Sequence, residues 1–181
     1  MGYVFYTKPA AKPISYSEHF RSLNDILYIV IHATGNKTDT AKANATYYAT
    51  SNTRKAGANF FVDDISVYQS IAPTKIAYAV GGEKYDDCKT TGGGKLHRKC
   101  NNANSISIEL CSTDGKISEK TLENAVILTC DLMKKYHVAS NQVIMHFDVT
   151  GKHCPYWDGW WNKNHKEWYK FKKKVMEYGK I

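Results

Sequence analysis

The sequence predicts an α/β fold: a single domain with a central mixed β-sheet flanked by helices on both faces. Segments with strand character alternate along the chain with segments of helical periodicity, which is typical of a sheet covered by helices. The chain has 181 residues, of which 43% are hydrophobic, enough for one full core and too few for two domains of ordinary size. The whole chain, residues 1–181, is therefore expected to fold as one domain.

The first half of the chain predicts a buried strand, a helix and a hairpin. Residues 27–32 (LYIVIH) form a continuous apolar run with branched side chains, which indicates a strand in the middle of a sheet. Residues 40–52 place alanines and tyrosines on one helical face. Residues 59–64 and 66–71 are expected to form a hairpin that turns at Asp63 and Asp64, and 76–80 a short strand before a Gly-rich loop.

The second half predicts two more strands, each followed by a helix. Residues 105–111 alternate as a strand does, and 142–147 form a third buried strand. Between them, residues 118–136 carry one apolar helical stripe, with lysines in the last turn that suit the helix dipole. Residues 165–178 predict a basic amphipathic helix near the C-terminus.

The charge and the hydropathy of the sequence limit which classes of binding partner and which cellular location are expected. The net charge of +8 favours a polyanionic partner: nucleic acid, a teichoic-acid-bearing wall or a membrane surface. No nucleic-acid motif is recognisable, so binding of nucleic acid is not expected. The first residues lack the order of a secretory signal and no apolar run reaches the length of a membrane span, so we expect synthesis in the cytoplasm without a signal peptide and no membrane insertion.

The five cysteines do not predict a disulfide framework, because their number is odd and they are scattered. Cys88 and Cys100 flank the Gly-rich loop and could form a disulfide in an oxidising medium or remain separate thiols. A zinc site made of these two cysteines and His97 would lack a fourth ligand nearby, and its spacing fits no common zinc finger.

Three other residues, His32, His146 and Cys154, are the candidate metal ligands of the sequence. His32 closes the first buried strand and His146 nearly closes the last, so both imidazoles are expected at one edge of the sheet. Cys154 follows eight residues later, beyond Gly151. Two histidines and a cysteine with an open fourth position fit catalytic zinc, because a structural site would take four protein ligands. The alternatives are a hydrogen-bonded core histidine at position 32, a small buried hydrophobe at 154, and His153 as ligand in place of His146.

Four motifs together resemble a known family. IVIHATGN, NFFVDDISVYQSI, NANSISIELC and MHFDVTGKHCP occur in the order seen in type-2 N-acetylmuramoyl-L-alanine amidases, the catalytic domains of phage endolysins and prophage autolysins. That family shares its fold with peptidoglycan recognition proteins. The resemblance covers roughly residues 25–160. It implies one zinc ion held by His32, His146 and Cys154.

The resemblance also implies two catalytic residues. Glu109 falls where many members of the family place an acidic general base, and Lys152 where they place the residue that stabilises the oxyanion. From the residues alone, a surface carboxylate on an edge strand is the favoured interpretation of Glu109, and Lys152 could be one more exposed lysine. The chain departs from some relatives at Asn59 or Phe60, in place of a catalytic tyrosine, and at Ala79, in place of a histidine.

The resemblance implies a zinc-dependent amidase that cuts the bond between the lactyl group of N-acetylmuramic acid and L-alanine in bacterial peptidoglycan. The alternative is a module of the same fold that binds peptidoglycan without hydrolysing it. We expect the enzyme to act on the cell wall after release, as a monomer. The segments 38–58 and 82–104 are expected to form the walls of the cleft.

Overall fold

The computed structural model describes residues 2–179. Its main sheet has six strands in the order β1-β5-β4-β7-β3-β8, in which only the β4–β5 pair is antiparallel. The strands are β1 (Val4–Tyr6), β2 (Tyr16–Phe20), β3 (Tyr28–Ala33), β4 (Phe60–Val62), β5 (Ser66–Gln69), β6 (Lys75–Ala77), β7 (Ser105–Leu110) and β8 (Val143–Met145). The helices are α1 (Ala41–Thr50), α2 (Cys88–Thr91), α3 (Glu119–Tyr136), α4 (His146–Thr150) and α5 (Lys166–Tyr178).

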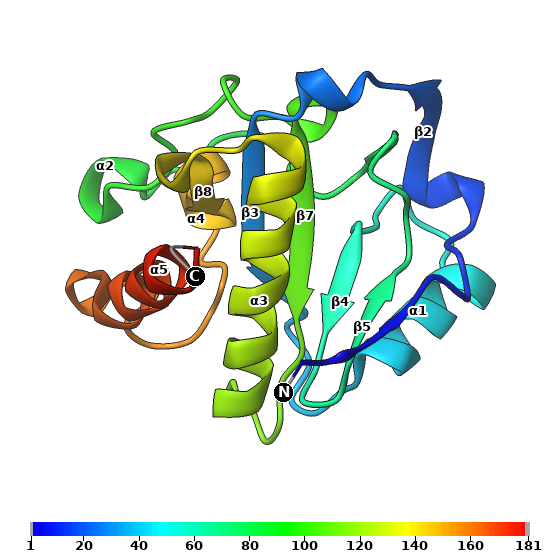
Figure 1. Ribbon diagram of the computed structural model, residues 1–181. Helices are drawn as coiled ribbons and strands as arrows, with labels where there is room; N and C mark the ends of the chain where they lie inside the picture. The colour runs from blue at the N-terminus through cyan, green and yellow to red at the C-terminus, as the bar shows by residue number, and fades with distance from the viewer. Residues whose placement is uncertain (1, 180–181) are drawn as a thin grey trace.

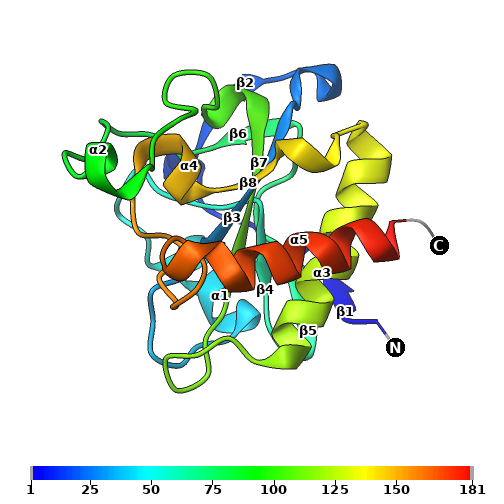
Figure 2. The ribbon, with the colours of Figure 1, turned by 90° about the vertical axis from the view of Figure 1, so that its left-hand side faces the viewer.

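Helices cover both faces of this sheet, as predicted. α3 lies across β7 and β3 with α5 beside it, and α1 lies on the opposite face over β4 and β5 (Figures 1 and 2). Alternation along the strands explains the two layers. On β4, Phe60 packs into the large core under α3, and the next residue, Phe61, packs against Ala41 and Ala45 of α1.

The sequence predicted the central strands and helices closely, but it did not predict the strands at the edge of the main sheet and outside it. Two strands were missed: β1, a short exposed strand at the sheet edge, and β2. β2 pairs with β6 in a separate two-stranded antiparallel sheet, so the strand expected at 76–80 is not part of the main sheet. β1 and β2 carry little of the buried apolar pattern on which sequence reasoning depends.

The strand expected at 142–147 is shorter than predicted. β8 ends at Met145, and His146 is the first residue of α4. The carboxylate of Asp148 accepts a hydrogen bond from the Met145 N–H at 2.8 Å, which caps the new helix. Gly151 then ends α4 in the left-handed conformation, with φ of 85°. His146 therefore reaches the sheet edge from a helix rather than from a strand.

No helix among residues 2–179 is long and apolar enough to cross a membrane.

The five cysteines are free and buried. The thiol of Cys88 lies 3.5 Å from the Thr150 carbonyl oxygen, and Cys100 packs against Val30 and Ile144, so the structure has no disulfide between the two.

Candidate metal centre

Three chain segments meet where the central parallel strands end. His32 lies on β3 and is paired in register with Glu109 of the neighbouring strand β7. On its other side β3 pairs with β8, which leads directly into His146. Because the carboxyl ends of parallel strands lie at one edge of a sheet, side chains that are far apart in sequence come together here.

The segment from 146 to 154 turns back on itself and delivers Cys154 to the same place. The Phe147 N–H donates to the Cys154 carbonyl oxygen at 3.0 Å, which closes the loop between α4 and the cysteine. The Ala33 N–H, one residue after His32, donates to Cys154 Sγ at 3.4 Å. His32 and Cys154 are thus tied through the backbone of β3.

The side chains of His32, His146 and Cys154 converge on one point. Their ligand atoms lie within 4.8 Å of one another, and within residues 2–179 this is the one group of His, Cys, Asp and Glu close enough to hold a metal ion. The two imidazole rings are 4.7 Å apart at 61°, and Cys154 Sγ lies 4.0 Å from Nδ1 of His32. The trio expected from the sequence is therefore brought together. The set of Cys88, His97 and Cys100 is not.

Burial prepares both histidines to act as ligands. Burial lowers the pKa of His146 to about 3, with the charge of Lys152 adding to the shift. Burial, followed by His146 and Lys152, also holds the pKa of His32 well below its usual range. Both rings are neutral near pH 7, so each keeps a lone pair on nitrogen for a metal. Nε2 of His32 and both nitrogens of His146 are buried without a hydrogen-bond partner.

Unpartnered buried nitrogens are costly unless something binds them, so this donor set fits a metal ion. Burial raises the pKa of Cys154 to about 12, with Glu109 adding to the shift. A neutral thiol is the form expected without a nearby cation, and a bound metal would deprotonate it. Two imidazoles and one thiolate, with a position left open, suit zinc.

His153 is not a competing ligand. Its ring stacks on Trp161 with centroids 3.7 Å apart, and its Nε2 lies 2.8 Å from a carboxylate oxygen of Asp87. The side chain therefore faces the 82–104 segment, away from its neighbour Cys154.

Glu109 lies beside the trio and does not belong to it. Oε1 of Glu109 is 3.9 Å from Nδ1 of His32, and its Oε2 is buried without a partner. Burial raises the pKa of Glu109 to about 7; the charge of Lys152 opposes the shift and Asp39 adds to it. A carboxyl group that titrates near neutral pH can both take up and release a proton.

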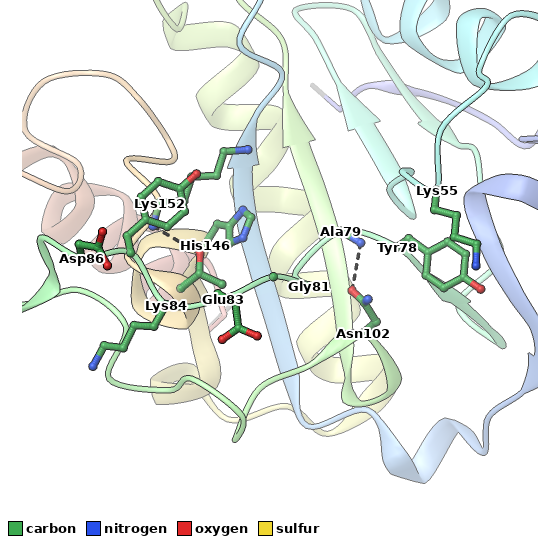
Figure 3. Close-up of a pocket in the computed structure, with 13 residues that line it drawn as sticks. Lys55, Tyr78, Ala79, Gly81, Glu83, Lys84, Asp86, Asn102, His146 and Lys152 are labelled. Atoms are coloured by element: carbon green, nitrogen blue, oxygen red, sulfur yellow. Dashed lines mark hydrogen bonds between the residues drawn. The ribbon is translucent and has the colours of Figure 1, made fainter.

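Lys152 is exposed and shares a cavity with His146. The cavity has a volume of about 760 Å³. Gly82–Asp86 and Asn102 come from the segment 82–104, and Lys55 from the segment 38–58, so both segments contribute walls as predicted. Tyr78, Ala79 and Gly81 complete the wall between them, and Figure 3 shows these side chains around the space. Sequence reasoning did not single out Asn102 or Tyr78.

The structure shows what the side chains at positions 59, 60 and 79 contact. Asn59 is fully buried: its Nδ2 donates to the Ile71 carbonyl oxygen, and its Oδ1 accepts from the Ser107 N–H. Phe60 packs in the core on the opposite face of the sheet from His32. Neither residue faces the metal centre. Ala79 lines the cavity with a methyl group alone.

Comparison with known proteins agrees with this geometry. A family model described as N-acetylmuramoyl-L-alanine amidase matches residues 22–157. The chain belongs to this family. The curated amidase CwlL of Bacillus licheniformis is 33% identical over 124 residues, which cover 67% of this chain and 32% of that protein. XlyB of Bacillus subtilis is 30% identical over 131 residues, covering 71% of this chain and 37% of the relative.

The chain thus spans about a third of the length of these curated amidases. Solved structures cover it more completely. PlyL superposes with a TM-score of 0.72 at 25% identity, over 97% of both chains. The catalytic domain of XlyA gives a TM-score of 0.70 at 24% identity, over 97% of this chain and 99% of that one, which supports the shared fold.

Proposed function

We propose that this amidase-family chain is a zinc-dependent N-acetylmuramoyl-L-alanine amidase that hydrolyses the lactyl–L-alanine amide bond of bacterial peptidoglycan. The observation that carries the proposal is the convergence of two neutral histidines and a buried cysteine within 4.8 Å, beside a carboxyl group whose pKa is about 7. Such an enzyme would act on the cell wall, in the manner of an endolysin or autolysin.

His32, His146 and Cys154 would hold the zinc ion. Zinc bound there would supply Lewis acidity and lower the pKa of a coordinated water toward neutrality. Amide hydrolysis also needs a group that accepts a proton from the attacking water and passes it to the departing amine. Glu109 suits this part because its carboxyl lies next to the ligand trio and burial raises its pKa well above the usual value of a carboxyl group.

Lys152 would stabilise the negative charge that develops on the carbonyl oxygen. It is two residues from Cys154, lines the same cavity as His146, and is not paired in any ion pair formed by residues 2–179. Its charge acts on both histidines and on Glu109, which indicates that its ammonium lies within electrostatic reach of the whole site.

The test combines metal content with product analysis. The protein purified under mild conditions should contain about one zinc per chain by elemental analysis. Incubated with purified sacculi, it should release peptides that begin with a free L-alanine amine, detected by mass spectrometry. Binding of sacculi without release of such peptides would favour the non-catalytic module.

Two cysteine variants test whether Cys154 is a metal ligand. Cys154→Ala should abolish zinc binding and release of peptides. Cys130→Ala is the matched control, because Cys130 is also buried but packs in the core, where its thiol lies 3.2 Å from the Val175 carbonyl oxygen. Full zinc retention in Cys154→Ala, or equal loss in both variants, would contradict the assigned ligand set.

A further inference from the structure

One amide side chain in the cavity beside the metal centre is fixed in a way that the proposed catalytic steps do not require. Asn102 begins the short 3-10 turn Asn102–Asn104, which leads into β7. It lines the same cavity as His146 and Lys152, next to the backbone of Ala79 and Gly81 (Figure 3).

The orientation of this amide is set by its neighbours. Its Oδ1 accepts two hydrogen bonds, from the Ala79 N–H at 3.0 Å and the Val80 N–H at 2.8 Å. A backbone N–H can only donate, so the atom that faces Ala79 and Val80 must be the oxygen. The amino group Nδ2 is left for the cavity, and among residues 2–179 no acceptor is hydrogen-bonded to it.

The backbone that carries Asn102 is also held firmly. The guanidinium of Arg21 is buried, and its Nη1 donates to the carbonyl oxygens of Asn102 and Ala103 at 3.1 Å and of Ser105 at 2.6 Å. A donor fixed by its own scaffold loses little entropy when it binds a ligand, so its hydrogen bond contributes to affinity more fully than one from a mobile side chain.

The neighbouring glycine leaves this donor open. A Cβ atom at Gly81 would lie 3.6 Å from Nδ2 of Asn102, in van der Waals contact with it. The same space is bordered by the ammonium groups of Lys55, Lys84 and Lys152, and also by the carboxylates of Glu83 and Asp86. The oriented N–H of Asn102 itself can only donate, so the group that it binds must present an acceptor oxygen.

We propose that Asn102 is a substrate-binding residue whose Nδ2 donates to a carbonyl or carboxylate oxygen of the muropeptide. The inference rests on the proposed function, because it takes peptidoglycan as the ligand of this cavity. Both the peptide stem and the acetylated, lactyl-bearing sugar carry such oxygens. Oxygens of either part could accept the hydrogen bond from Asn102, and the experiment below decides which part supplies the oxygen.

The sharpest variant is Asn102→Asp. Aspartate still accepts from the Ala79 and Val80 N–H groups, so the scaffold is kept, but the donor is replaced by an acceptor that repels the substrate oxygen. With a soluble muramoyl-peptide as substrate, we expect KM to rise about tenfold, the effect of losing one well-placed hydrogen bond, with kcat changed less than about twofold. Zinc content and the midpoint of thermal unfolding should stay at wild-type values.

Asn101→Asp is the matched control. Asn101 is the adjacent residue and its Oδ1 caps the same turn by accepting from the Ala103 N–H, but it does not line the cavity. The substitution adds the same charge one residue away and should leave KM unchanged. A KM for Asn102→Asp equal to wild type, or an equal rise in Asn101→Asp, would overturn the inference.

Gly81→Ala gives a second test that leaves Asn102 intact. Its methyl group would cover Nδ2, so KM should rise severalfold here too. The source of the oxygen follows from product inhibition: the inhibition constant of either the free stem peptide or free N-acetylmuramic acid should rise in Asn102→Asp. If neither rises, the inference fails. If the wild-type protein itself releases no peptide, the proposed function fails, and calorimetric binding of the muramoyl-peptide to wild type and Asn102→Asp still tests Asn102.

Discussion

Replacing Glu109 by glutamine tests the proton-transfer step separately from metal binding. The substitution keeps the size and shape of the side chain and removes its ability to accept a proton. Oε1 of Glu109 lies 3.9 Å from His32 Nδ1, beyond hydrogen-bonding distance, and its Oε2 has no partner. The change therefore breaks no hydrogen bond that supports the fold or orients a zinc ligand.

The expected loss is in kcat. General acid–base catalysis contributes about 10²- to 10⁴-fold, and a glutamine can still orient water, so we expect a decrease of roughly a hundredfold or more, about 2.7 kcal/mol in activation free energy. KM should change little, because the lost interaction belongs to the transition state. Zinc content and the thermal transition should match those of the wild-type protein.

Glu83→Gln is the control for charge alone. Glu83 is exposed and lines the same cavity, so its substitution removes one negative charge near the substrate without touching the metal centre. Initial rates of peptide release over a range of substrate concentrations separate kcat from KM for both variants. Near-wild-type kcat in Glu109→Gln would refute the reasoning, and loss of zinc or of the folded state would show that Glu109 is structural.

Three further outcomes are expected. Gly151→Ala should lower the free energy of unfolding by roughly 2–3 kcal/mol, because its φ is 85° and the new Cβ would lie 2.1 Å from Cys88 Sγ; adding Cys88→Ala should restore part of the loss in a chemical denaturation cycle. Asp63→Ala should cost roughly 2 kcal/mol by the same assay, because its carboxylate accepts from the backbone N–H groups of Ile65, Ser66 and Ala41. Binding to sacculi should weaken as salt is raised to about 0.5 M, since the α5 lysines other than Lys172 are exposed, and salt-independent pull-down would contradict this.

The parts of the fold that sequence reasoning predicted are those in which local pattern and tertiary burial agree. β3 is an apolar run and β7 alternates serine with isoleucine, and the central residues of both strands are almost completely buried. α3 begins where Ser118 caps it, accepting from the Thr121 N–H at 3.0 Å, and it ends beside Lys134 and Lys135. In these elements the chain carries its own start and stop signals.

The convergence of His32, His146 and Cys154 was predictable for a different reason. His32 and Cys154 are chemically distinctive residues at places where strands or loops end, and the motif around Cys154 matched a known family. The helical start at His146 was not predictable from periodicity, because α4 is a single turn whose cap, Asp148, lies inside the helix it stabilises. Asn102 opens the motif NANSISIELC, but the motif did not indicate the role of its side chain, since the orientation of the amide depends on Ala79 and Val80 from another segment.

The cavity wall formed by residues 82–104 and the α4 segment that carries His146 form one packed unit. The N–H groups of Tyr85, Gly94 and Leu96 donate to carbonyl oxygens of Thr150, Phe147 and Asp148 in the α4 segment. A Cβ at Gly93 would lie 2.8 Å from both the Gly151 backbone and the Phe147 ring, so the two segments touch without space between them.

Because of this packing, the 82–104 wall cannot move far without displacing the helix that holds His146. In the proposed amidase, a wall that is fixed relative to His146 would present its donors at set distances from the scissile bond, which would favour one arrangement of substrate oxygens over others. Lys84 and Asp86 lie at the exposed rim of this wall, where side chains can vary without disturbing the contacts beneath. Selectivity among peptide stems is therefore expected to reside in these rim side chains, and the position of the scissile bond in the buried contacts between the wall and α4.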